Sequence, residues 1–153
     1  MVRLTDLTPE YAEHLLSLEI PDFGPTPWAK APNLKDARVA IISTAGLHRT
    51  HDNKFSGGSG DYRLIPGDID FSDLVMSHVS INFDRSGFQQ DTNVVFPLER
   101  LRELEQNGEI GSVAKWHYSF MGATDPTRMV ETGPQVAKLL KEDNVTAAIL
   151  VPI

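Results

Sequence analysis

Two uninterrupted apolar runs constrain the fold more than any other feature of this sequence. Residues 38–44 read RVAIIST, and residues 145–153 read VTAAILVPI. A run without polar alternation is typical of a strand buried on both faces, as in a parallel sheet. Residues 74–81, LVMSHVSI, predict a further strand of this kind. The chain should therefore form a sheet that is covered on both sides.

Amphipathic helices are predicted between these strands. Residues 97–108 carry leucines three residues apart, with Pro97 near the start and Gly108 at the C′ position. Residues 133–143 form a second amphipathic segment. Strands that alternate with such helices predict an α/β fold, with a mostly parallel, Rossmann-like or flavodoxin-like sheet flanked by helices.

The chain is divided into an N-terminal helix and extended arm at residues 1–34 and an α/β domain at residues 35–153. Thr8 fits the N-cap of a helix over residues 7–19, with Pro9 at its first position. Four prolines in the rest of the arm exclude regular structure there. We expect this irregular, Pro-rich arm to wrap over the domain.

Composition excludes several classes of function. The net charge is -7, which disfavours nucleic acid and anionic membrane surfaces as partners. No apolar run approaches the roughly 20 residues of a membrane span, and no signal-peptide core is present, so we expect a cytoplasmic protein. The 153 residues contain 0 Cys, which excludes a disulfide, a thiolate metal site and a cysteine nucleophile within them.

Polar residues follow the predicted strands. Residues 44–51 come after the first strand, His78 and Asp84 lie at or beyond the end of the second, and residues 117–121 belong to a later apolar piece, WHYSFMG. In a parallel α/β sheet, ligands bind outside the carboxyl ends of the strands. We therefore expect these groups along one edge. The long polar segments 47–70 and 83–93 are predicted as loops.

Several short patterns admit a functional and a structural interpretation. His48 and His51 have a spacing that chelates a metal on a helix, but no third ligand is evident, and a solvated loop accounts for them. The GGSGD stretch at residues 57–61 matches neither a P-loop nor a dinucleotide fingerprint, which favours a flexible loop.

A hydrolase triad is a further alternative at the second strand. Ser77, His78 and Asp84 or Asp91 supply the residue types, but the glycines of a nucleophile elbow are missing. Neighbouring side chains on a strand also point to opposite faces. A His78 that is hydrogen-bonded to Asp84 is the simpler interpretation.

Several ordered blocks resemble one protein family. They are residues 61–68, 77–104 and 108–122, with Ser77-His78, Asp84, the run from Asp91 and Asn93 to Leu98, Gly108-x-Ile110-Gly111 and the segment His117 to Gly122; Thr44-Ala45-Gly46 also fits. Together they resemble the selenoprotein B subunits of glycine, sarcosine and betaine reductases and the selenocysteine-containing subunit of D-proline reductase. The resemblance covers about residues 35–153 and does not choose the substrate.

The resemblance implies an activity and its partners. In the family, a selenolate or thiolate takes part in reductive cleavage of a C–N bond, helped by a pyruvoyl group on a partner subunit and reset by a thioredoxin-like reductant. The substrate is a small amine or amino acid. The supporting catalytic residues would be His78, Asp84 and His117, with the two histidines as candidate proton donors; the substrate-binding residues would be Thr44, Gly46, Ser77, Asp91, Asn93 and Tyr118. No metal is implied.

The sequence departs from the family at its redox centre. Family members carry a selenocysteine or cysteine, two residues and a cysteine directly after a strand like AAILVPI, so the family nucleophile would follow Ile153. We expect that the gene product continues through a UGA-encoded selenocysteine, that these residues alone are inactive, and that the apolar strand at 145–153 drives self-association. The rival expectations are a short non-catalytic paralogue that acts as a binding or scaffold subunit, and a racemase-like or hydrolytic enzyme using His78, Asp84 and His117.

Overall fold

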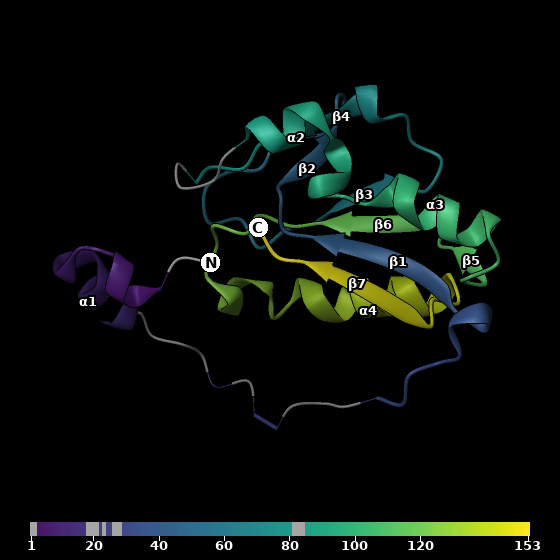
Figure 1. Ribbon diagram of the computed structural model, residues 1–153, viewed down its shortest axis with the longest axis horizontal. Helices are drawn as coiled ribbons and strands as arrows, with labels where there is room; N and C mark the ends of the chain where they lie inside the picture. The colour runs from purple at the N-terminus through teal and green to yellow at the C-terminus, as the bar shows by residue number, and fades with distance from the viewer. Residues whose placement is uncertain (1–2, 18–21, 23, 26–28, 81–84) are drawn as a thin grey trace.

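The computed structural model describes residues 3–17, 22, 24–25, 29–80 and 85–153. Its central element is strand β1 (Arg38–Ser43), which confirms the strand predicted at 38–44. Val39, Ala40 and Ile41 are buried, as expected for an apolar run between two layers. Figure 1 shows β1 in the middle of the main sheet, with helices on both sides.

The main sheet is mostly parallel and is built around β1. Its other strands are β3 (Arg63–Pro66), β5 (Ser112–Val113), β6 (Trp116–Ser119) and β7 (Ala147–Val151). Strands β5, β6 and β7 are parallel to β1, and β3 is antiparallel to β6. Because β7 pairs with β1 along residues 39–43, β5 and β6 must follow one another along the opposite edge of β1.

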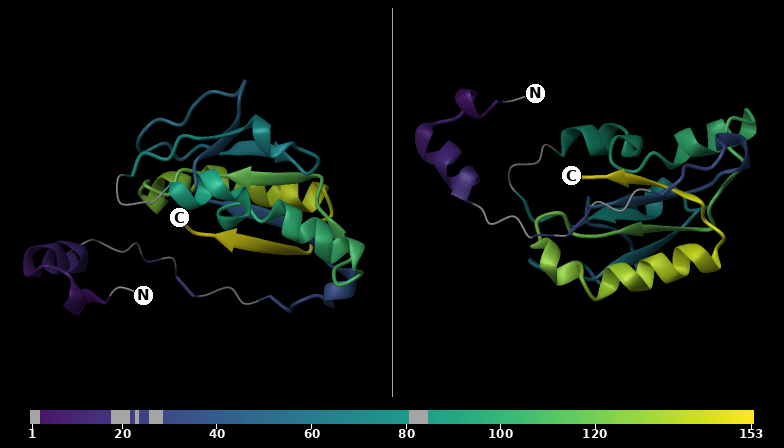
Figure 2. Two further views of the ribbon diagram at one scale, coloured as in Figure 1. Left: turned by 45° about the horizontal axis from the view of Figure 1, so that its top comes forward. Right: turned by 90° about the horizontal axis from the view of Figure 1, so that it is seen from below.

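Two helices cover the two faces of this sheet (Figure 2). Helix α4 (Thr132–Glu142) buries Val136 against Tyr118 and Phe120 on one face. Helix α3 (Leu98–Gln106) buries Leu98 and Leu101 on the other face, in the core that includes Ile41, Leu47, Ile65 and Phe96. Gly108 has φ 69° just beyond α3, the left-handed conformation that suits glycine at C′. Both predicted helices are confirmed.

The remaining elements are short. Helix α1 spans Pro9–Ser17 and α2 spans Ser86–Gln90; strands β2 (Leu47–Arg49) and β4 (Leu74–Met76) form a separate antiparallel pair. The 3-10 turns are η1 (Leu4–Asp6), η2 (Leu34–Asp36), η3 (Phe71–Asp73), η4 (Thr92–Val94) and η5 (Pro126–Met129).

Three predictions for the middle of the chain are wrong. The predicted loop at 47–70 contains β2 and β3, and the predicted loop at 83–93 contains α2 and the start of η4. The strand predicted at 74–81 shortens to β4, which pairs with β2 outside the parallel sheet. Leu74 and Met76 contribute to the core while Val75 alternates with them, a pattern typical of a half-buried antiparallel strand.

The arm does not wrap over the domain in its described part. Helix α1 confirms the predicted helix, and the Tyr11 amide donates to the Thr8 hydroxyl at 3.4 Å, but no residue of α1 is buried. Figures 1 and 2 show α1 standing apart from the sheet. Leu16 remains 71% exposed because no other described element packs against it. The proposed arm anchors Phe23 and Trp28 lie outside the described residues.

The α/β architecture with a mostly parallel sheet between helices is confirmed, and the Rossmann-like or flavodoxin-like assignment stays a prediction. In the described part of the chain, no helix combines the length and apolar character needed to cross a membrane.

Candidate functional site

The carboxyl ends of β1, β6 and β7 meet at one edge of the sheet, as the sequence predicts for a parallel arrangement. Thr44 follows β1, and its amide donates to the Val151 carbonyl at 3.0 Å. The Thr44 hydroxyl accepts from the Ile153 amide at 2.8 Å and lies 3.3 Å from the Ile153 carbonyl oxygen. Gly122 follows β6, and a Cβ there would lie 2.3 Å from the same oxygen. The Thr44 hydroxyl therefore holds the end of β7, and Gly122 leaves room for the Ile153 carbonyl.

Gly46 and His78 extend this carboxyl edge. Gly46 has φ 66°, and a Cβ at this position would lie 3.0 Å from the His78 nitrogen. The Ser77 amide donates to the Gly46 carbonyl at 2.9 Å, which fixes residues 77 and 78 beside the turn after β1. Glycine is required here by both the left-handed backbone and the close approach.

His78 is a buried neutral imidazole at this edge. Its Nδ1 accepts from the Ser80 amide at 3.3 Å, so the neutral ring carries its hydrogen on Nε2. Burial lowers the pKa of His78, the Arg85 guanidinium lowers it further, and a hydrogen bond with the Ile153 backbone acts in the opposite direction. Arg85 also donates to the His78 carbonyl. The predicted partner Asp84 lies outside the described residues.

Ser77 pairs with His48, a contact that the sequence did not indicate. Its hydroxyl lies 2.7 Å from Nε2 of His48, whose Nδ1 lies 2.7 Å from the Arg49 carbonyl. Since a carbonyl only accepts, Nδ1 donates and Nε2 accepts from Ser77. His48 is 2% exposed, so the predicted solvated position is wrong. The register of β2 and β4 produces this pair, which no local motif could signal.

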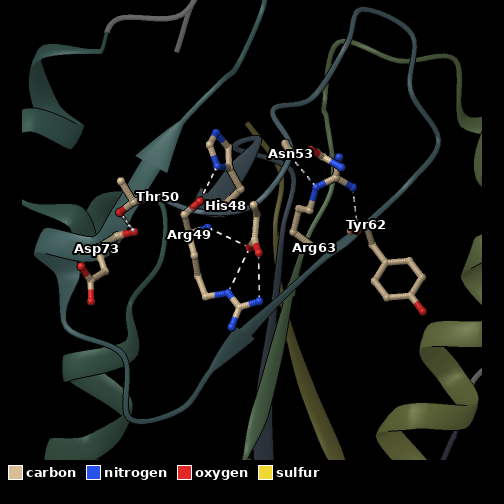
Figure 3. Close-up of polar contacts among 8 residues, drawn as sticks. His48, Arg49, Thr50, Asn53, Tyr62, Arg63 and Asp73 are labelled. Atoms are coloured by element: carbon tan, nitrogen blue, oxygen red, sulfur yellow. Dashed lines mark hydrogen bonds and ion pairs between the residues drawn. The ribbon is translucent and has the colours of Figure 1, made fainter.

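Two arginines hold the loop after β2 in place (Figure 3). The Arg49 side chain donates to Asp52 at 2.9 and 3.1 Å, and this hydrogen bond holds the pKa of Asp52 below its ordinary value against the effect of burial. Arg63 donates to the carbonyls of Asn53 and Tyr62, both at 2.9 Å. Across the described residues, no three potential metal-ligating side chains form a cluster.

His117 lies inside the domain, on β6. Its Nδ1 accepts from the Ile41 amide at 2.9 Å, and its ring meets Phe96 edge-to-face at 5.6 Å. Burial, and then the Arg102 guanidinium, lowers the pKa of His117 to about 4. At pH 7 only about one ring in a thousand is then protonated. Nδ1 of His117 therefore takes the place of a backbone carbonyl of β6 as the hydrogen-bond acceptor for the Ile41 amide.

The remaining predicted site residues are dispersed. Tyr118 is buried on the α4 face, next to Tyr62 and Phe120. Asp91 caps η4 by accepting from the Asn93 amide at 2.9 Å. The Asn93 side chain then bonds Glu99 at the start of α3. Asp91 and Asn93 thus have local structural partners, whereas Thr44, Gly46, Ser77 and His78 are brought together.

Two cavities border other parts of the domain. One has a volume of about 760 Å³ and lies near the start of β6, between Gly67, Arg102 and Trp116. The glycine-rich stretch at 57–61 borders another, of about 440 Å³. There, a Cβ on Gly60 would lie 2.0 Å from the Arg128 carbonyl oxygen, so the glycine permits close packing of two backbones.

Comparison with known proteins finds relatives that are named as subunits of reductases. The D-proline reductase subunit gamma of Acetoanaerobium sticklandii is 34% identical over 135 residues, which are 86% of this chain and 55% of that protein. The sarcosine reductase complex component B subunit beta of Peptoclostridium acidaminophilum is 32% identical over 127 residues, 78% of this chain and 29% of that protein. The chain therefore spans about half or less of the length of these relatives.

A glycine reductase component is also similar, and the family assignment is direct. The glycine reductase complex component B subunit gamma of Carboxydothermus hydrogenoformans is 28% identical over 142 residues, 87% of this chain and 32% of that protein. No solved structure matches the chain. The profile of the family described as glycine/sarcosine/betaine reductase selenoprotein B matches residues 10–152, and the chain belongs to that family.

Proposed function

We propose that this chain supplies the sheet edge at which a B-type subunit of a reductase complex cleaves the C–N bond of a small amine or amino acid. The observation that carries the proposal is the convergence of Thr44 and His78 on the end of β7, with Gly46 packed against His78. Ligands of parallel α/β sheets bind outside the carboxyl ends of the strands. The relatives named as reductase subunits support the same class of reaction.

The reacting selenium or sulfur atom lies outside the 153 residues, because they contain 0 Cys. We propose a selenocysteine or cysteine beside the carboxyl end of β7, which when present supplies an ionised nucleophile near neutral pH. Thr44 and His78 border this position, since both bond Ile153. A pyruvoyl group on a partner subunit and a thioredoxin-like reductant complete the proposed assembly.

The roles at the edge differ in kind. His78, with Asp84, is proposed to hold or deliver the proton that the leaving amine requires. Thr44 and Gly46 set the backbone geometry of the edge, and Ser77 links it to His48. His117 is proposed to support the edge from the interior through its bond with the Ile41 amide. It is not proposed as a proton donor, because its ring is almost entirely neutral at pH 7.

The complete reductase complex provides the test. Turnover of glycine, sarcosine, betaine and D-proline is measured for the native complex and for complexes carrying Thr44→Val or His78→Asn. We expect at least a tenfold loss with the native substrate, whereas His51→Asn, a change at an exposed histidine, leaves turnover unchanged. Undiminished turnover in both edge variants would refute the assignment and favour a non-catalytic binding or scaffold subunit.

Self-association is proposed for the same chain. Strand β7 pairs only with β1 among the described strands, and Leu150 is 70% exposed. An unpaired, uncharged strand edge is a template for pairing with another copy. Light scattering at rising protein concentration should show an increase in mass, and a constant monomer mass would contradict the proposal.

A further inference from the structure

His48 is a buried histidine whose two ring nitrogens are both occupied. It lies on β2, which pairs with β4, and it is 2% exposed. Nδ1 donates to the Arg49 carbonyl and Nε2 accepts from the Ser77 hydroxyl, each at 2.7 Å. The ring therefore has no nitrogen left to bind a substrate or a metal. Any effect of His48 on the carboxyl edge must pass through Ser77.

Ser77 transmits the position of His48 to His78. Its amide donates to the Gly46 carbonyl at 2.9 Å, which continues the antiparallel ladder of β2 and β4 by one residue. Neighbouring side chains in such a ladder point to opposite sides. Because the Ser77 hydroxyl is held toward His48, the next side chain is directed the other way. There the His78 ring meets the backbone of Ile153, at the end of β7.

The segment that carries His48 is anchored in the main sheet. The Leu47 amide donates to the Ser119 hydroxyl on β6 at 2.8 Å, and the Ala45 amide donates to the Ser43 hydroxyl on β1 at 3.2 Å. Both serines are fully buried. Strand β4, in contrast, pairs with β2 and lies outside the main sheet. The hydrogen bond to His48 thus links the end of β4 to a segment that the main sheet holds in place.

We propose that His48 is a positioning residue of the carboxyl edge, which holds the Ser77 hydroxyl and thereby fixes the His78 ring against the end of β7. His48 itself touches no substrate. Its effect on turnover rests on the proposed function, because it requires His78 to act at the edge. Its effect on the position of His78 requires no reaction and is measured separately.

Two NMR measurements on the chain report where residues 77 and 78 lie. The first is hydrogen exchange at the Ser77 amide, which bonds the Gly46 carbonyl. Its rate is divided by that of the Ile41 amide, which lies on β1 and follows general losses of stability. The second is the NOE between the Gly46 α-proton and the His78 amide proton, expected because a Cβ in place of that proton would lie 3.0 Å from the His78 nitrogen.

Matched variants separate the His48 contact from general packing. His48→Leu leaves the Ser77 hydroxyl without its acceptor, and Ser77→Ala leaves Nε2 of His48 without its donor. In both variants we expect the exchange ratio to rise at least tenfold and the NOE to weaken. His48→Gln, whose amide oxygen can accept from Ser77, should keep both signals near native. His51→Leu applies the same substitution to an exposed histidine and should leave both signals unchanged.

The complete reductase complex gives the kinetic readout. We expect His48→Leu and Ser77→Ala to lower kcat about tenfold and to keep KM within about twofold of the native value, because His78 is misplaced for proton transfer rather than for substrate binding. His48→Gln should recover most of kcat. A merely structural role would reduce the amount of folded complex and leave kcat per folded complex at the native value.

Two results would overturn the inference. One is a native exchange ratio in both His48→Leu and Ser77→Ala; if His48→Leu does not fold, Ser77→Ala decides. The other is native kcat in these variants while His78→Asn loses turnover. If His78→Asn itself keeps its turnover, the reductase role of the edge fails instead, and the exchange ratios still decide whether His48 fixes the position of His78.

Discussion

Acid should destabilise this protein well above the pH at which carboxylates titrate, and His117 is the cause. The folded chain holds its ring neutral with a pKa of about 4, against the ordinary value of 6.5 that applies after unfolding. Below pH 6.5 the unfolded chain therefore binds more protons than the folded chain, and stability falls as the pH falls. The loss continues until the pH reaches the folded value and then levels off.

The size of the effect follows from the two pKa values. With 6.5 and about 4, the linkage relation gives a loss of about 2 kcal/mol between pH 7 and pH 5, and about 3 kcal/mol by pH 4. The pKa of His78 is also lowered, mainly by burial, and so adds to the loss in the same direction. Carboxylates contribute little between pH 7 and 5, which makes this the window to measure.

Urea unfolding at pH 7, 6 and 5 is the assay, with His117→Asn as the diagnostic variant. An asparagine oxygen can accept from the Ile41 amide in place of Nδ1, but it does not titrate. The variant should be less stable at pH 7 because it loses the ring, yet its stability should fall by about 2 kcal/mol less than that of the native chain between pH 7 and 5. His51→Asn is the control. An unchanged pH dependence in His117→Asn would refute the reasoning.

Three further predictions concern single contacts, each measured as the free energy of unfolding in urea. Asp143→Asn should lower the free energy of unfolding by about 2–3 kcal/mol, because the carboxylate accepts from a guanidinium and two amides. A loss below about 0.5 kcal/mol would show that these contacts contribute little to stability. Gly122→Ala should lower the free energy of unfolding by about 1–3 kcal/mol, because the new Cβ overlaps the end of β7. Gly133→Ala, where a Cβ meets nothing within 4 Å, is the control and should be neutral or stabilising. Equal effects of the two changes would argue against the overlap. Ser77→Ala should lower the free energy of unfolding by about 1–2 kcal/mol, because it leaves Nε2 of His48 buried without its donor. Ser77→Thr keeps a hydroxyl and should retain most of this stability. Equal losses in the two variants would contradict the hydrogen bond.

The elements predicted correctly are those whose own residues determine burial. Strand β1 is apolar throughout, and α3 combines a stripe of leucines with a glycine that ends it, so local pattern suffices. Strands β2 and β3 were missed because each is short and only partly buried, and their polar residues resemble those of loops. Their strand conformation depends on neighbours distant in the sequence: β2 pairs with β4, and β3 with β6.

The same distinction applies to the candidate site. That Thr44 lies at the carboxyl edge follows from the rule for parallel strands. His78 reaches the same edge for a different reason, because β4 lies outside the parallel sheet and the Ser77 amide donates to the Gly46 carbonyl. The partners of the histidines do not follow from any rule. His48 meets a serine 29 residues away, and His117 meets an amide 76 residues away. Spacing along the chain carries no information about such contacts, so only the folded structure identifies them.

The two ends of β1 are held by different chemistry, and this difference bears on function. At the amino end, Arg38 bonds the Asp143 carboxylate at 2.6 Å and also donates to the Ser112 hydroxyl and the Val113 carbonyl. At the carboxyl end, the described contacts of Thr44 and Gly122 are neutral hydrogen bonds and close backbone packing. Charge-assisted bonds are stronger than neutral ones, so the amino end fixes the sheet. At the carboxyl edge, Arg85 donates to the His78 carbonyl, and its positive charge would favour the anionic nucleophile that we propose there.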